Sequence, residues 1–280
     1  MKAYEGIDFA NREENVGRCY VIDDGQQLTT TFTRPDELPI VRTAVDCPLG
    51  TTVGFLGLLQ GDLPPDDGNG FQLRHTEAWL RDILWDYHTN QYWRNRDRVE
   101  RRQFPRANYF HPTQHVQPTL GLRMVPACIY WLSENLAPHG TPEERLDALA
   151  DARRGEASIV EAHPRPFLYS AVERIWRHQQ ATVTIPVLNH VVGYKKLPSS
   201  RSEVYALLCS TNCWMGAAQR VLMPAQLPRE VMATDHAFDA WLCALTAWCH
   251  DNGETIDWTQ VPGLTQESVE IEGHILVLRQ

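Results

Sequence analysis

Three segments of this chain share one pattern, in which an apolar, strand-like run ends in an acidic residue and a turn follows. The acidic residues are Asp8, Asp46 and Glu161. If the three strands lie side by side and parallel, their carboxyl ends meet at one edge of a sheet, which is where open α/β sheets place their ligands. The pattern therefore predicts an α/β fold with an acidic site at that edge.

The beginning of the chain predicts three strands in succession, over residues 3–10, 16–23 and 28–34. The turn signal DDGQQ follows the second of them, and the third is rich in β-branched residues. Residues 40–46 are mostly apolar, as expected of a strand that is covered on both faces. We predict a mixed sheet in which the first three strands are antiparallel and the later strands are parallel, with helices flanking it.

Most of the remaining chain is predicted to be helical, because apolar residues recur there at helical spacing. The predicted helices cover residues 76–88, 120–136, 141–152, about 164–177, 200–214 and 234–251. Thr141 is the expected N-cap of the third of these, and the tail is expected to close as a hairpin about Glu272 and Gly273. We expect a single domain, residues 1–280, with a large helical and loop insertion at about residues 50–155.

The last long helix begins with a group of polar residues. Asp235, His236 and Asp239 fall within five positions, in front of an apolar helical face. Residues three or four apart on a helix project in similar directions, so Asp239 has either His236 or Asp235 beside it. We therefore predict that the start of this helix adds a fourth group of side chains to the acidic edge formed by the three strand ends.

Carboxylates gathered at one edge need a neutralising partner, because they repel one another and otherwise take up protons. Oxygen-rich ligand sets suit Mg²⁺ or Mn²⁺, and two such ions roughly 4 Å apart can clamp a phosphoryl group. His236 could be a further ligand or could accept the proton of an attacking water. Divalent cations are therefore the expected cofactors of the acidic edge.

Four short motifs, GIDFA, AVDCPLG, VEAHPR and DHAFDAWLCALTA, occur in this order and resemble the family of predicted RNase-H-like nucleases known as domain of unknown function 429. The resemblance covers most of the chain. The last motif is also similar to the final catalytic motif of RuvC-type nuclease domains. In that comparison Asp8 matches the first-strand Asp, Asp46 matches a fourth-strand acid that is more often Glu, and His236 and Asp239 match the final pair. Glu161 belongs to the E-x-x-P pattern of the family.

The resemblance implies an RNase-H-like fold and a divalent-metal-dependent nuclease that hydrolyses phosphodiester bonds of DNA or RNA. Asp8, Asp46 and Asp239 would hold Mg²⁺ or Mn²⁺, His236 would be a ligand or proton acceptor, and Glu161 an outer ligand or substrate-positioning acid. The alternative is an RNase-H-like binding or regulatory module with weak or no turnover. A phosphotransferase is a third possibility, since the same fold carries sugar kinases, although the sequence has no glycine-rich phosphate loop.

Most candidate residues also have an ordinary structural interpretation, which for His236 is that of a surface residue. Asp8 can begin a turn, and Asp46 can form an Asx turn. Glu161 can pair with Arg165 at the start of the following helix. Asp235 can cap the last helix, because an acid there suits the helix dipole and the free N–H groups.

An arginine-rich segment lies within the predicted insertion. Its candidate substrate-binding residues are Arg94, Arg96, Arg98, Arg101 and Arg102. Arginine forks match phosphate oxygens, so the segment could clamp a nucleic-acid backbone. The alternative is a solvated helix face, because acidic residues are mixed with the arginines and most charge runs are of this kind.

Composition limits the classes of protein that fit. The chain has 43% hydrophobic and 22% charged residues, as in ordinary globular proteins. A net charge of −9 argues against a protein that coats nucleic acid through its overall field, but not against a local phosphate site. No apolar run approaches a membrane span, and the first residues lack a signal-peptide core, so we expect a cytoplasmic protein with no membrane partner and with cysteines that are buried free thiols. Whether it forms a homo-oligomer stays open.

Overall fold

The computed structural model describes residues 1–9, 16–50, 74–76, 79–80, 131–132, 134–179, 182–218, 221–224 and 227–279. The chain divides into two compact units. Unit 1 comprises Met1–Asp46, Ser158–Ile256 and Leu276–Gln280, and unit 2 comprises Cys47–Ala157 and Asp257–Ile275. A single domain with an insertion at about residues 50–155 stays a prediction, because most of that range lies outside the described residues.

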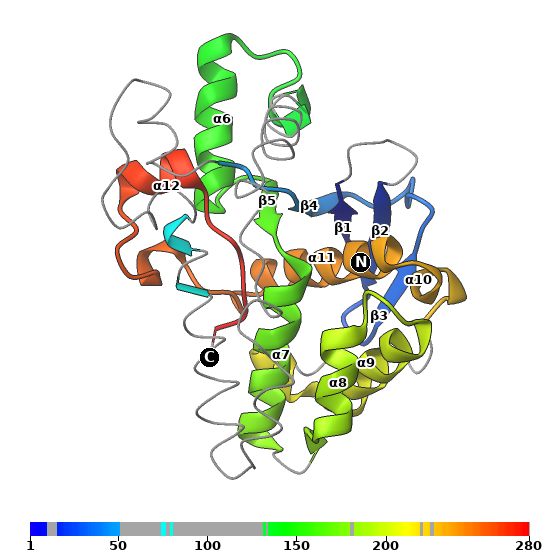
Figure 1. Cartoon of the computed structure of the whole chain (residues 1–280). Helices are drawn as coiled ribbons and strands as arrows, with labels where there is room; N and C mark the ends of the chain where they lie inside the picture. Colours follow the sequence, from blue (N-terminus) through cyan, green and yellow to red (C-terminus); the bar gives the residue numbers. More distant parts are fainter. Residues whose placement is uncertain are drawn as a thin grey trace. The chain divides into compact units, whose positions relative to one another are not determined.

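Unit 1 is built on a five-stranded mixed sheet (Figure 1). Its strands are β1 (Lys2–Asp8), β2 (Gly17–Asp23), β3 (Leu28–Thr31), β4 (Ile40–Asp46) and β5 (Ile159–Ala162). Their order across the sheet is β3-β2-β1-β4-β5. Strand β2 is antiparallel to β1 and β3, whereas β4 is parallel to β1 and β5 is parallel to β4. The predicted mixture of strand directions is confirmed.

The register of the parallel strands brings two of the predicted acids side by side. Asp8 pairs with Asp46 at the carboxyl ends of β1 and β4. At the next strand Asp46 pairs with Ala162, while Glu161 pairs with Val45. Because successive side chains of a strand point to opposite faces of a sheet, Asp8 and Asp46 lie on one face and Glu161 on the other.

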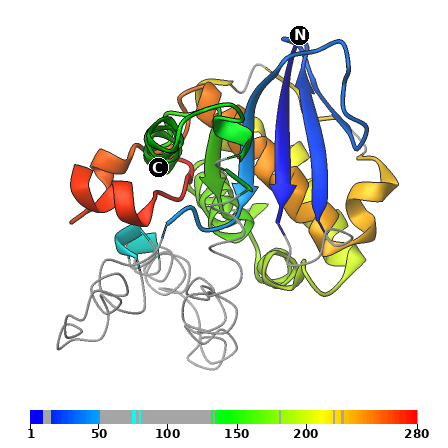
Figure 2. The same ribbon diagram turned by 90° about the horizontal axis from the view of Figure 1, so that it is seen from above.

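Helix α11 (Asp235–Asp251) packs against the sheet face that carries the two paired acids. Figure 2 shows this helix in orange beside the blue strands. Gly6 of β1 makes the close approach possible, because a Cβ at this position would collide with the backbone carbonyl oxygen of Ala240. The contact between Gly6 and Ala240 places the preceding residue of the helix, Asp239, near the ends of the strands.

The other helices of unit 1 follow β5. They are α7 (Pro164–His178), α8 (Ile185–Gly193), α9 (Pro198–Ser210), the 3-10 helix η6 (Asn212–Ala218) and α10 (Arg229–Ala233). Helices α7 and α9 confirm the helices predicted at about residues 164–177 and 200–214, apart from their exact ends. Helices α8 and α10 were not predicted; they have nine and five residues, too few for a clear apolar period.

Unit 2 contains α6 (Pro142–Arg154), the 3-10 helix η7 (Trp258–Gln260) and α12 (Gln266–Glu272). Thr141 caps α6 as predicted, since its hydroxyl accepts a hydrogen bond from the N–H of Glu144. The predicted hairpin about Glu272 and Gly273 is wrong, because a capping box at Thr265 starts a short helix there and Gly273 ends it. The predicted helices at 76–88 and 120–136 lie mostly outside the described residues.

Cysteine chemistry follows the prediction of buried free thiols only in part, because Cys209 and Cys213 are partly exposed. The cysteines with free thiols in the described part of the chain are Cys19, Cys209, Cys213, Cys243 and Cys249. Cys47 is disulfide-bonded, which corrects the expectation for that residue. Within the described ranges, no helix combines the length and the apolar character needed to span a membrane.

Candidate metal centre

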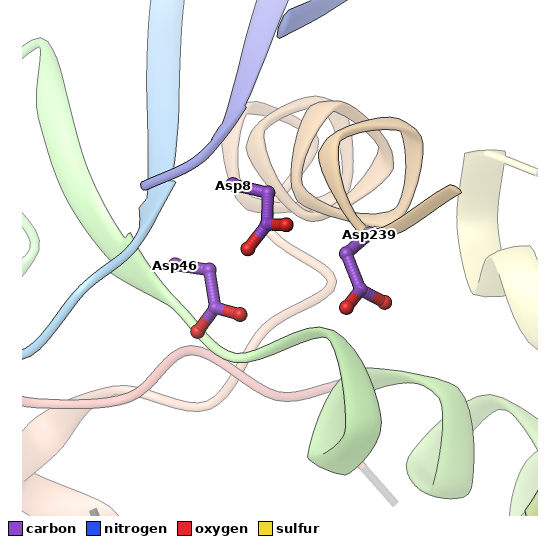
Figure 3. A group of neighbouring side chains, drawn as sticks. All are labelled: Asp8, Asp46 and Asp239. Carbon is purple, nitrogen blue, oxygen red and sulfur yellow. The ribbon is translucent and has the colours of Figure 1, made fainter. Parts of the chain in front are cut away.

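Three carboxylates meet where β1, β4 and α11 come together. Asp8, Asp46 and Asp239 each offer one oxygen, and these three oxygens all lie within 4.8 Å of one another. Figure 3 shows the three side chains pointing into a common space, two from strand ends and one from the helix. Asp239 is 1% exposed, so its charge is removed from bulk water. The structure thus brings together three of the predicted site residues.

Burial and mutual repulsion disfavour the charged forms of these acids. Burial and then the charge of Asp239 raise the pKa of Asp8 to about 8. Burial and then the charge of Asp8 raise the pKa of Asp46 well above its ordinary value. The pKa of Asp239 is also raised by burial. A divalent cation would reverse these shifts by favouring the charged carboxylates, and an all-oxygen donor set of this kind fits Mg²⁺ or Mn²⁺.

Lys195 was not among the predicted site residues, yet it contacts the acidic group directly. Its Nζ lies 2.6 Å from Oδ2 of Asp239, and its side chain is 34% exposed. The hydroxyl of the neighbouring Tyr194 donates a hydrogen bond of 2.7 Å to Oδ1 of the same carboxylate. Burial alone would lower the pKa of Lys195, but the charges of Asp239 and Asp46 outweigh it and raise that pKa. Lys195 is therefore a charged internal counterion of the acids.

A buried arginine holds the turn that carries Lys195 next to α11. The guanidinium of Arg201, in α9, donates to the carbonyl oxygen of Tyr194 at 2.9 Å. It also donates to the carbonyl oxygens of Met232 and Ala233, at 2.9 and 3.2 Å, just before α11 begins. The lysine and the start of α11 are thus tied to the same side chain.

His236 contacts the acidic group from the solvent side. Its Nδ1 lies 2.5 Å from Oδ2 of Asp8, and its side chain is 47% exposed. The contact ties the ring to Asp8, while the exposed part of the ring faces water. The sequence left open whether His236 or Asp235 stands beside Asp239; in the structure His236 reaches the acidic group through Asp8, whose carboxylate lies within 4.8 Å of that of Asp239.

The cap of α11 is Thr234 and not Asp235, which corrects the interpretation of Asp235 as the cap: the Thr234 hydroxyl accepts a hydrogen bond of 3.0 Å from the N–H of Ala237. Asp235 is the first residue of the helix, where a negative charge is favourable. It does not belong to the group of three carboxylates that the described residues form. In addition to burial, its charge contributes to the raised pKa of Asp8.

Glu161 and His163 lie next to this group. Glu161 is 2% exposed, and its charge adds to burial and to the charge of Asp8 in raising the pKa of Asp46. The register of β5 places the Glu161 side chain on the opposite face of the sheet, away from the three clustered carboxylates. Nδ1 of His163 lies 3.9 Å from Oδ1 of Asp46. His163 was not predicted, although it stands within the VEAHPR motif.

The candidate substrate-binding arginines Arg94, Arg96, Arg98, Arg101 and Arg102 all lie outside the described residues. Their role stays a prediction.

The model of the family described as "Protein of unknown function (DUF429)" matches residues 6–263. The chain belongs to this family. The matched range includes every residue of the acidic group and Lys195, so the candidate metal centre of this DUF429 protein lies within the family region. Comparisons with curated proteins and with solved structures found no match.

Proposed function

We propose that this DUF429 protein is a divalent-metal-dependent nuclease with an RNase-H-like fold, which hydrolyses phosphodiester bonds of DNA or RNA. The observation that carries the proposal is the convergence of Asp8, Asp46 and Asp239 within 4.8 Å of one another. Carboxylates at the ends of a first and a fourth strand, joined by one from the last long helix, are what the resemblance to RuvC-type domains implies.

In this proposal the three aspartates hold Mg²⁺ or Mn²⁺. When bound, such ions supply Lewis-acid stabilisation of a phosphoryl group and favour attack by water. Glu161 is proposed as an outer ligand or substrate-positioning acid that does not contact the metal directly, since it lies on the opposite sheet face.

His236 is proposed to accept a proton during the reaction. The contact between its Nδ1 and Asp8 orients the ring. This arrangement leaves Nε2 to take a proton from a water, and the exposure of the ring allows the proton to leave to solvent.

Cleavage assays with labelled DNA and RNA, single-stranded and duplex, test the proposal. We expect cleavage with Mn²⁺ or Mg²⁺ and none with EDTA. Asp46→Asn removes one ligand charge and should abolish cleavage. Asp251→Asn is the matched control, because Asp251 lies at the other end of α11 and pairs with Lys2. Equal cleavage by the wild type and by Asp46→Asn would contradict the mechanism.

Binding of nucleic acid without cleavage in any of these conditions would favour the alternative, a binding or regulatory module of the same fold. The ion pair between Lys195 and Asp239 is compatible with it, since it neutralises part of the acidic group without a metal.

A further inference from the structure

Helix α7 contains three arginines, of which two are ion-paired. Arg174 pairs with Glu254 at 2.9 Å, and Arg177 pairs with Glu173 at 2.6 Å. Arg165, in the first turn, is different: its Nε is buried and has no hydrogen-bond partner, and no ion pair of Arg165 occurs in the described part of the chain. The pairing of Arg165 with Glu161 that the sequence allowed does not form.

Arg165 lies near residues that adjoin the acidic group. It follows Ala162 by three residues, and Ala162 pairs in the sheet with Asp46. The positive charge of Arg165 also acts on the phenol of Tyr194, where it opposes the rise in pKa that burial causes. Tyr194 in turn donates a hydrogen bond to Asp239. Within the described residues this partly buried arginine forms no ion pair with the neighbouring acids, so its guanidinium keeps donor capacity for an anion.

Lys195 lies near the same place. Burial raises the pKa of the Tyr169 phenol to about 12, and the charges of Arg165 and Lys195 both work against this rise. The two cations therefore lie near one buried phenol, beside the acids. A divalent cation among the carboxylates would repel the Lys195 ammonium and compete with it for Asp239. Lys195 would then be available to an anion, as Arg165 already is.

We propose that Arg165 and Lys195 form a phosphate-binding subsite beside the acidic cluster, which receives a phosphate group of the nucleic-acid substrate. This inference rests on the proposed function for the identity of the substrate. The guanidinium fork suits two phosphate oxygens, and the ammonium adds a point charge. The subsite fixes the phosphate next to the carboxylates, and the exposed part of Lys195 lets the lysine follow the ligand.

Calorimetric titration with thymidine and uridine 5′-monophosphates as probes, with and without Mn²⁺, tests the subsite apart from turnover. We expect Mn²⁺ and the nucleotide to strengthen each other's binding in the wild type. Arg165→Gln should weaken nucleotide binding by roughly tenfold or more, since it removes a charged phosphate contact. It should leave Mn²⁺ affinity in the absence of nucleotide unchanged. Arg177→Gln, on the same helix, should behave as the wild type, and Arg165→Lys should restore part of the affinity.

Lys195→Met is the second variant. It should raise Mn²⁺ affinity, because the competing cation is removed, and it should lower nucleotide affinity. Lys196→Met, at the exposed neighbouring position, is its control and should change neither. A fall in both Mn²⁺ affinity and thermal stability with unchanged nucleotide binding would make Lys195 a structural counterion and overturn its part of the subsite.

The outcomes separate the subsite from the nuclease. A protein that cleaves nucleic acid but binds nucleotides independently of Arg165, or binds neither probe, would overturn the subsite and leave the nuclease. Arg165-dependent nucleotide binding without cleavage of any substrate would support the subsite and contradict the nuclease.

Discussion

His236 lies in contact with Asp8 while about half of its side chain is exposed, a position suited to proton transfer at the edge of the site. If the ring accepts a proton in the reaction, His236→Ala should lower the cleavage rate by about 10²-fold. Mn²⁺ affinity should change little, because the three aspartates remain. Rates and calorimetric Mn²⁺ titrations of the same variant check this; a large loss of metal affinity would show instead that His236 is a ligand.

The residues of the acidic cluster could be predicted because each has a local signal. Asp8 and Asp46 end apolar strands, and Asp239 stands one turn inside an apolar helix. Lys195 has no such signal: a lysine just after a helix is ordinary, and nothing in the sequence distinguishes it from Lys196. Its contact with Asp239 depends on how the turn after α8 packs against α11, which is a tertiary property.

The packing of α11 on β1 depends on Gly6. Gly6→Ala places a methyl group against the backbone of Ala240, and a backbone group cannot move aside as a flexible side chain can. We expect a loss of more than about 3 kcal/mol in the free energy of unfolding, measured by urea denaturation. Gly193→Ala is the control, because its new Cβ would meet only Oγ of Ser200 at 3.5 Å. If both variants lower the free energy of unfolding only slightly and to the same extent, the close packing of helix and strand would be contradicted.

Long periodic segments and the cap at Thr141 could be predicted, and short elements could not. The apolar tail ILVL has the pattern of a strand, but it forms only isolated bridges, one of Leu276 with Ala162 and one of Leu278 with Thr255. The turn expected before it is α12, where the capping box of Thr265 outweighs the weak hairpin signal.

Stability of the whole molecule should depend on pH in a direction that follows from the raised carboxylate pKa values. In metal-free protein, Asp8 holds its proton up to about pH 8 when folded, but releases it near its ordinary pKa of 3.8 when unfolded. The folded state therefore binds more protons between these values, and stability falls as the pH rises through this window. Asp46 and Asp239 act in the same direction.

Thermal unfolding in EDTA should therefore show a lower Tm at about pH 8 than at about pH 5. Mn²⁺ should raise the Tm most at the higher pH, where the carboxylates are charged, and Asp46→Asn should flatten the dependence. A Tm in EDTA that rises between these two pH values would contradict the account of the buried acids.

The boundaries of the two compact units have no local signal in the sequence, for a topological reason. Each unit is assembled from separate stretches, with boundaries at residues 46/47, 157/158, 256/257 and 275/276. Such boundaries do not require the Gly- or Pro-rich linkers by which adjoining domains are usually identified. The mixed sheet could be predicted, because its strand directions follow from short turns at the start of the chain and long connections later.

Calorimetric titration of the metal-free protein with Mn²⁺ tests most directly whether the three aspartates form a metal centre. The wild type and Asp251→Asn should both bind Mn²⁺ in a saturable manner. Asp239→Asn should weaken this binding by at least the ~10–100-fold that follows loss of an outer-shell partner. No binding by the wild type, or equal binding by Asp239→Asn, would mean that protons and Lys195 alone neutralise these acids, and the proposed metal centre would be contradicted.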